Sequence, residues 1–209
     1  MLWLGTSPNQ PEVRTMLDAH EIGLLAQPWG SSTIRVGWIW AADNGCFNMG
    51  KWKEERWMLW LSSDHPRSGC LFATVPDALC DHEGTLIRWR KYRQAVADLR
   101  YPVAFVAQNG AMPSNVPWDE MDCLFIGGDD WFKTAASTFA LARHARSLGK
   151  WVHVGRVNSL KRLMLWRDDA DSSDGTFLAY GPEKNAPRVK HWVESLRSQP
   201  TLTGAIREK

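Results

Sequence analysis

Residues 123–155 read CLFIGGDDWFKTAASTFALARHARSLGKWVHVG, and this segment predicts a β-strand, an α-helix and a second β-strand. The apolar run 123–128 closes on glycines and acids, which favours a buried strand that ends there. An alanine-rich segment at 134–148 has helical composition and stops before Gly149, a residue typical of helix ends. A short β-rich run at 151–155 completes a βαβ unit, in which the two strands lie parallel.

The same alternation runs along the whole chain. We predict strands at 2–6, 22–27, 34–43, 71–77, 103–108, 123–128, 151–155 and 171–174. We predict helices at 12–20, 53–62, 83–99, 134–148, 159–167 and 184–197.

Eight strands followed mostly by helices predict an α/β protein with a compact (β/α)8 TIM barrel as a single domain over 1–209. Residues 178–209 are expected to form a C-terminal helical tail. An open, doubly wound sheet is the alternative. Both architectures place their chemistry at the carboxyl ends of parallel strands.

Composition excludes several classes of protein. The 209 residues carry 25 basic and 23 acidic side chains, a balance of +2, and 44% are hydrophobic, which favours a soluble globule over a disordered chain. No apolar run is long enough to span a membrane, and the N-terminal sequence lacks the features of a secretion signal. The four cysteines are widely spaced, so we expect no zinc site and no disulfide framework, and a cytoplasmic location.

Three of the predicted strands have an aspartate as their last residue, namely Asp43, Asp77 and Asp174. One aspartate before glycine is usually a turn former, but three on one face of a barrel indicate acid/base or nucleophilic chemistry. His153 lies within a strand, and we interpret it as a hydrogen-bonded barrel histidine. Because no histidine pair has metal-ligand spacing, we expect no metal and no cofactor.

Six short motifs at the strand ends occur in a recognisable order: ADNGCF (42–47), VPD (75–77), FVAQNG (105–110), FIGG (125–128), VHVG (152–155) and DSSDGT (171–176). In this order they resemble the tRNA-guanine transglycosylase superfamily, and they are most similar to its DpdA-like branch, which exchanges guanine in DNA for a 7-deazaguanine. The resemblance covers about residues 1–178.

The resemblance implies specific roles for the matching residues. Asp174 is expected to be the nucleophile that forms a covalent bond to the sugar, and Asp43 the general acid/base. Either Asp77 or Asp81 is expected to read the edge of the purine. The remaining base-binding positions implied by the motifs are Gln108, Gly127, Gly128 and Gly155.

The family's zinc-binding cysteine cluster is absent after Asp174, and residues 177–209 contain no cysteine. This departure favours DNA over tRNA. We therefore expect guanine exchange in single-stranded DNA, or at a guanine flipped out of a duplex, with a free 7-deazaguanine base as co-substrate. A tRNA-guanine transglycosylase and a non-catalytic barrel that binds nucleic acid are the alternatives.

A nucleic-acid substrate requires cations that contact phosphates. We expect a phosphate-binding rim formed by Lys51, Lys53, Arg56, Lys133 and Arg156. The basic helix predicted within 86–100 is interpreted either as a second phosphate-binding face or as a solvated helix with ion pairs.

Overall fold

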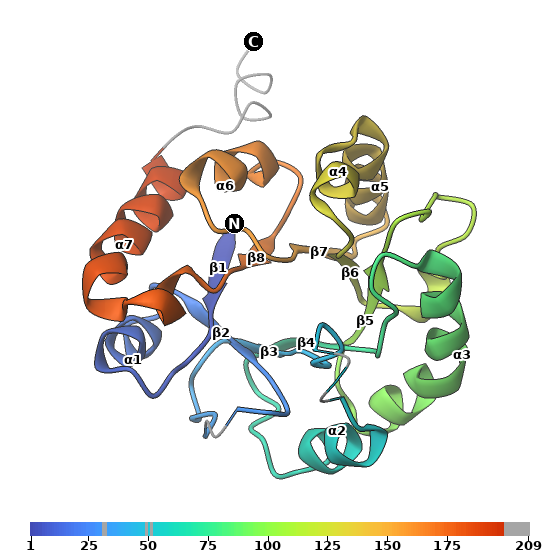
Figure 1. The fold of residues 1–209 in the computed structure, drawn as a ribbon, viewed down its shortest axis with the longest axis horizontal. Coiled ribbons are helices and arrows are strands. Elements are labelled where there is room, and N and C mark those ends of the chain that lie inside the picture. Colours follow the sequence, from blue (N-terminus) through green and yellow to red (C-terminus); the bar gives the residue numbers. More distant parts are fainter. Residues whose placement is uncertain (31–32, 49, 51, 199–209) are drawn as a thin grey trace.

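The computed structural model describes residues 1–30, 33–48, 50 and 52–198. In these residues eight parallel strands form a closed barrel, in which each strand pairs with the next along the chain and β8 pairs with β1 (Figure 1). The strands are β1 (Leu2–Gly5), β2 (Gly23–Ala26), β3 (Trp40–Ala42), β4 (Cys70–Thr74), β5 (Val103–Ala107), β6 (Cys123–Ile126), β7 (Trp151–Val154) and β8 (Ser172–Asp174). The predicted barrel is confirmed, and the open sheet is excluded.

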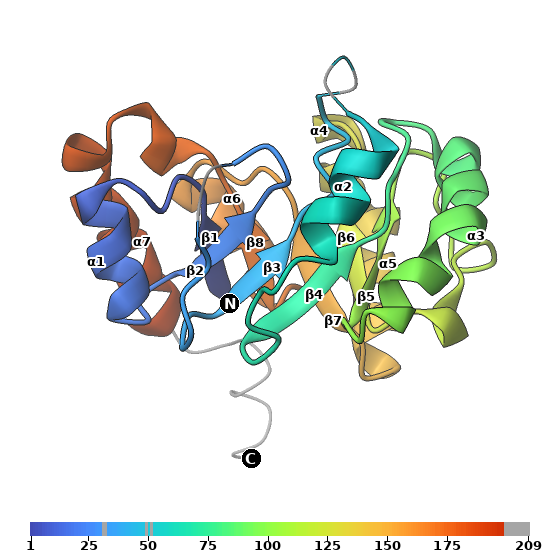
Figure 2. The same ribbon diagram turned by 90° about the horizontal axis from the view of Figure 1, so that it is seen from below.

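Helices surround the barrel on its outside (Figures 1 and 2). They are α1 (Pro11–Asp18), α2 (Glu54–Leu61), α3 (His82–Asp98), α4 (Asp130–Thr134), α5 (Ala136–Ser147), α6 (Leu160–Trp166) and α7 (Pro182–Ser198), with the 3₁₀ turns η1 (Trp118–Glu120) and η2 (Phe177–Tyr180). Among the described residues, no helix has both the length and the apolar character to cross a membrane.

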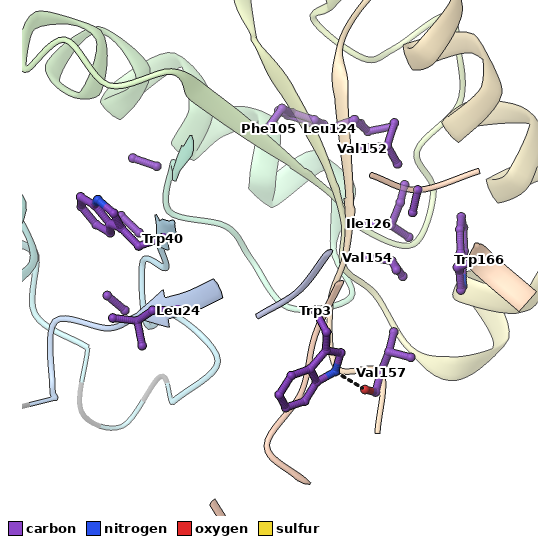
Figure 3. Packing of buried hydrophobic residues seen from close by; sticks show 14 of the residues in the cluster. Trp3, Leu24, Trp40, Phe105, Leu124, Ile126, Val152, Val154, Val157 and Trp166 are labelled. Carbon is purple, nitrogen blue, oxygen red and sulfur yellow. Dashed lines mark hydrogen bonds between the residues drawn. The ribbon is translucent and has the colours of Figure 1, made fainter. Parts of the chain in front are cut away.

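The apolar side chains form two separate cores because successive residues of a strand point to opposite faces. The larger core fills the space between barrel and helices and includes Leu24, Trp40 and Phe105 (Figure 3). A smaller core, with Leu25, Ala41 and Phe72 among its members, fills the barrel interior. Burial in these two layers is the main source of the stability of the fold.

Two elements differ from the sequence-based expectation. Of the predicted strand 34–43 only Trp40–Ala42 joins the sheet, because Gly37 turns the chain with a positive φ and Trp38 donates to Asp18. The predicted helix 134–148 corresponds to α5, and a separate short helix, α4, precedes it; the two helices meet at Ala135, whose backbone is extended. The first of them begins early because the Asp129 carboxylate caps the Phe132 N–H at 2.7 Å.

Much of the predicted C-terminal tail forms helix α7, which packs against the other outer helices. Helix α7 contacts α1 and α6, and it buries Val189 and Trp192. It therefore completes the outer helical layer, as Figure 1 shows beside α1. Residues 199–209 of the predicted tail lie outside the described residues.

Candidate functional site

A cavity of about 300 Å³ opens at the carboxyl ends of the strands, which is the end of a (β/α)8 barrel where active sites lie. Its volume is at the lower end of the range for small-molecule sites, roughly 300–1,000 Å³. Most of the predicted site residues line it: Asp43, Asp77, Gln108, Gly127, Gly128, Gly155, Arg156 and Asp174.

Asp174 is the last residue of β8 and is buried. Its Oδ1 accepts hydrogen bonds from His153 Nε2 at 3.1 Å and from the Arg156 backbone N–H at 3.0 Å. Within the described ranges no hydrogen bond reaches Oδ2. The carboxylate is thus held by one oxygen, and its other oxygen is available to a ligand in the cavity.

Asp43 follows β3 and shares the cavity with Asp174. Gln27 Nε2 donates to its Oδ2 at 3.2 Å. Burial first, and then the negative charges of Asp174 and Asp77, raise the pKa of Asp43 from 3.8 to about 7. A carboxyl group with this pKa can both donate and accept a proton at neutral pH.

Of the two acids expected to read the edge of the base, Asp77 is the one that lines the cavity. It lies just beyond the end of β4. Asn44 Nδ2 donates to its Oδ1 at 2.9 Å, and Gln108 Nε2 donates to its Oδ2 at 2.6 Å. Burial raises the pKa of Asp77 in spite of these hydrogen bonds. Asp81, by contrast, is outside the cavity lining and caps helix α3 by accepting from the Gly84 N–H at 3.0 Å.

Gln108 has more than the expected role of binding a heterocycle. Its Oε1 accepts from the backbone N–H groups of Cys80 at 2.9 Å and Gly128 at 2.8 Å, so both lone pairs are used. Its Nε2 already donates one proton to Asp77 and retains one more. Gln108 therefore fixes the shape of the cavity and offers a ligand a single N–H.

The expected glycines allow close contacts around the cavity. A Cβ on Gly127 would lie 2.7 Å from Gln108 Nε2, and one on Gly155 would lie 2.7 Å from the Phe125 ring. Larger residues at these positions would displace the side chains that line the site.

His153 on β7 is fully buried, and both of its ring nitrogens have partners. The expected hydrogen-bonded barrel histidine is thus confirmed. The sequence did not indicate that one partner is Asp174, because the two residues are 21 positions apart and meet only through β7–β8 pairing. Within the described part of the chain, no group of three or more His, Cys, Asp or Glu side chains is arranged to hold a metal ion.

One of the expected phosphate-binding cations is buried, and a second has partners at the cavity mouth. Lys133 is buried, its Nζ donates to the Gly155 carbonyl at 2.9 Å, and burial lowers its pKa to about 8, so its assignment to an exposed rim is wrong. Arg156 donates to the Gly128 carbonyl and lies over the Phe47 ring at 4.8 Å, although it does line the cavity.

The other described rim residues, Lys53 and Arg56, are exposed. Arg56 lies over the Trp29 ring at 4.6 Å, and Lys53 is exposed just before α2. Lys51 lies outside the described residues.

Two cations of the basic helix α3 form ion pairs, and a third donates to a backbone carbonyl. Lys91 pairs with Glu54 at 2.8 Å, Arg93 pairs with Glu120 at 2.8 Å, and Arg88 donates to the Asp77 carbonyl at 2.6 Å.

Exposed apolar side chains surround the cavity mouth, a feature that sequence reasoning missed. Phe47 is 63% exposed and Tyr180 is 82% exposed, and both line the cavity together with Leu79. Trp131, in the first turn of α4, is also 75% exposed but lies outside the cavity lining. Phe47, Leu79 and Tyr180 each follow a different strand, and this placement in the sequence could have indicated that they lie at the mouth.

No family model matches the chain, and no curated protein matches it significantly. Among solved structures, tryptophan synthase from M. tuberculosis in its aminoacrylate- and BRD0059-bound form superposes with a TM-score of 0.55 at 12% identity, over 93% of this chain and 90% of that chain. KGPDC from Streptococcus mutans superposes with a TM-score of 0.53 at 12% identity, over 93% of this chain and 95% of that chain. At this identity the likenesses establish the architecture alone: the chain has the fold of a (β/α)8 barrel.

Proposed function

We propose that the protein exchanges guanine in DNA for a 7-deazaguanine base through a covalent bond between Asp174 and the sugar. The observation that carries this proposal is the pairing of two unlike carboxyl groups in one cavity. Asp174 has one oxygen anchored and the other without a hydrogen bond among the described residues, whereas Asp43 has a pKa raised to about 7. A nucleophile and a separate acid/base are what glycosyl transfer by double displacement requires.

The reaction balances with these two residues. Asp174 Oδ2 forms a bond to C1′ while the C1′–N9 bond breaks and its electron pair goes to the guanine. Asp43 donates its proton to the departing base, which leaves neutral. The incoming 7-deazaguanine then gives its N9 proton to Asp43, its N9 attacks C1′, and Asp174 is released as the carboxylate.

The remaining polar groups of the cavity suit a flat purine-like ring. Asp77, held by Asn44 and Gln108, would accept hydrogen bonds from the N–H groups of the guanine edge. Gly127 lets the Gln108 amide pack closely against the backbone, where it donates to Asp77. Because both the leaving and entering bases carry the same N–H edge, one pocket serves both.

A base stacked in a duplex cannot reach this cavity, so the substrate guanine has to be unpaired or flipped out. The exposed side chains at the mouth support an unpaired strand, since Phe47 and Tyr180 offer surfaces on which neighbouring bases stack. Lys53 and Arg56 are the described cations of the expected rim that remain for phosphate contacts.

The test compares purified wild type with Asp174→Asn and with Asp129→Asn, a matched control at another strand end that lies outside the cavity lining. Single-stranded DNA, duplex DNA and tRNA, each with labelled guanine, are incubated with candidate 7-deazaguanines, and released guanine is counted. Asp174→Asn should reduce exchange by on the order of a thousandfold or more, since loss of the nucleophile removes the covalent route. Asp129→Asn should retain wild-type exchange.

With the free base withheld, wild type should form a denaturation-resistant adduct with DNA that mass spectrometry maps to Asp174. Near wild-type exchange by Asp174→Asn, or an adduct at another residue, would contradict the mechanism. Release of label from tRNA alone would transfer the proposal to a tRNA substrate.

A further inference from the structure

A buried row of hydrogen bonds runs across the barrel interior to the proposed nucleophile. Trp151 Nε1 donates to Ser172 Oγ at 2.8 Å, His153 Nδ1 lies 2.8 Å from the same Oγ, and His153 Nε2 lies 3.1 Å from Asp174 Oδ1. The row follows from strand geometry. Two residues of β7 and two of β8, each two positions apart, point to the same face of the sheet, and His153 is in register with Ser172.

The two ends of the row together set its direction. An indole N–H can only donate, so Ser172 Oγ accepts from Trp151 and has its own proton to give. At the other end the Asp174 carboxylate can only accept, so it takes the Nε2 proton, and Nδ1 of the neutral ring accepts the proton of Ser172. The neutral Nε2–H tautomer therefore donates to Asp174 Oδ1, and every donor in the row has an acceptor.

The packing around the histidine ring prevents it from turning away. Its ring centroid is 4.4 Å from that of Phe125 and 5.0 Å from that of Phe72, and the residue is fully buried. These contacts keep Nδ1 facing Ser172 and Nε2 facing Asp174.

We propose that His153, held in its orientation by Ser172 and Trp151, is a positioning residue that holds Asp174 by Oδ1 so that Oδ2 attacks the sugar. This inference rests on the proposed function. When Oδ2 bonds to C1′, Oδ1 becomes the carbonyl oxygen of the ester and continues to accept from Nε2–H. When the ester breaks, the negative charge returns to a carboxylate whose orientation has not changed. No proton moves along the row, so the histidine keeps its role in both half-reactions.

The kinetic test uses two substitutions of His153. His153→Phe preserves an aromatic ring between Phe72 and Phe125 but removes both ring nitrogens, whereas His153→Gln retains an N–H that can reach Asp174. We expect His153→Phe to reduce kcat by about 10- to 100-fold, the usual loss when the partner that orients a reacting group is removed. The KM for the free base should remain within a factor of two or so of wild type. His153→Gln should recover most of kcat.

A second measurement requires no turnover. Long-range ¹H–¹⁵N NMR of the full chain, selectively labelled at histidine, reports which ring nitrogen of His153 carries the proton. Wild type should show Nε2–H. Ser172→Ala removes the donor to Nδ1, so the Nδ1 resonance should move toward that of a nitrogen without a hydrogen bond, while Nε2 keeps its proton because Asp174 Oδ1 still accepts it.

The outcomes separate the two proposals. If wild type does not exchange guanine at all, the proposed function fails, and the NMR result still decides whether the row fixes the histidine. A wild-type proton on Nδ1 overturns the inference. So does a folded His153→Phe variant, with a cooperative thermal transition, that retains wild-type kcat.

Discussion

Replacement of Asp43 by asparagine should make the protein more stable at alkaline pH while it removes the proposed proton donor. The native pKa of Asp43 is raised from 3.8 to about 7, whereas the unfolded chain has the ordinary value. Because the native pKa is the higher one, the contribution of Asp43 to stability is greatest below the unfolded pKa and falls as pH rises through about 7. At alkaline pH the folded protein therefore holds a charge that would be better solvated in the unfolded chain.

The magnitude follows from the size of the shift. A rise of about three pKa units corresponds to about 4 kcal/mol at pH 8, at about 1.4 kcal/mol per unit. Asp43 lines an open cavity and is only half-buried, so solvent screening reduces the expected cost to about 2 kcal/mol. At pH 5 the native carboxyl group is protonated, and the cost should be less than half of that at pH 8.

The assay is urea unfolding followed by tryptophan fluorescence at pH 5 and pH 8. We expect Asp43→Asn to be more stable than wild type by about 2 kcal/mol or more at pH 8 and by clearly less at pH 5. Asp129→Asn is the control, because hydrogen bonds lower the pKa of that exposed carboxylate and its loss brings no gain at pH 8. Exchange activity of Asp43→Asn should fall by about 10²- to 10⁴-fold, the usual contribution of a general acid. Equal stability at pH 8, or a gain that is the same at both pH values, would refute the raised pKa.

Three other changes have definite expected results. Gly127→Ala places a Cβ 2.7 Å from the Gln108 amide that donates to Asp77, so calorimetry should show about tenfold weaker binding of the free base. Gly50→Ala, at a position with open space around it, should bind the free base as wild type does. Tyr180→Ala should weaken binding of single-stranded, guanine-containing DNA by about 5- to 100-fold, because a base stacks on the Tyr180 ring. Ile87→Ala, which removes an apolar side chain that is 66% exposed on α3, should leave this binding unchanged. Equal losses of affinity in the two variants would exclude stacking at the mouth. Lys133→Met should leave DNA affinity and its salt dependence unchanged, because the ammonium is buried against a carbonyl, while Lys53→Glu should weaken binding most at low salt.

The sequence predicts the barrel well because each strand is a short apolar run with a polar or glycine end, and this pattern is local. The cavity residues could be predicted for the same reason: Asp43, Gln108 and Asp174 each end or follow a strand. What each side chain contacts could not be predicted. Lys133 has the sequence context of an exposed helix start, yet the chain folds it beneath the Gly155 carbonyl. Pairing between β7 and β8 decides the role of His153, and no local pattern encodes that pairing.

Closure of the barrel also fixes when the site comes into existence during synthesis. Leu4 on β1 is in register with Asp174 on β8, so the first and last strands of the sheet meet beside the proposed nucleophile. A ribosome-bound chain that has emerged only through β7 has Asp43 and Asp77 but neither Asp174 nor a closed sheet. Contacts that span nearly the whole chain form late in folding. The adduct that we propose at Asp174 should therefore form only on completion of the fold, and nascent chains that end before β8 should form none.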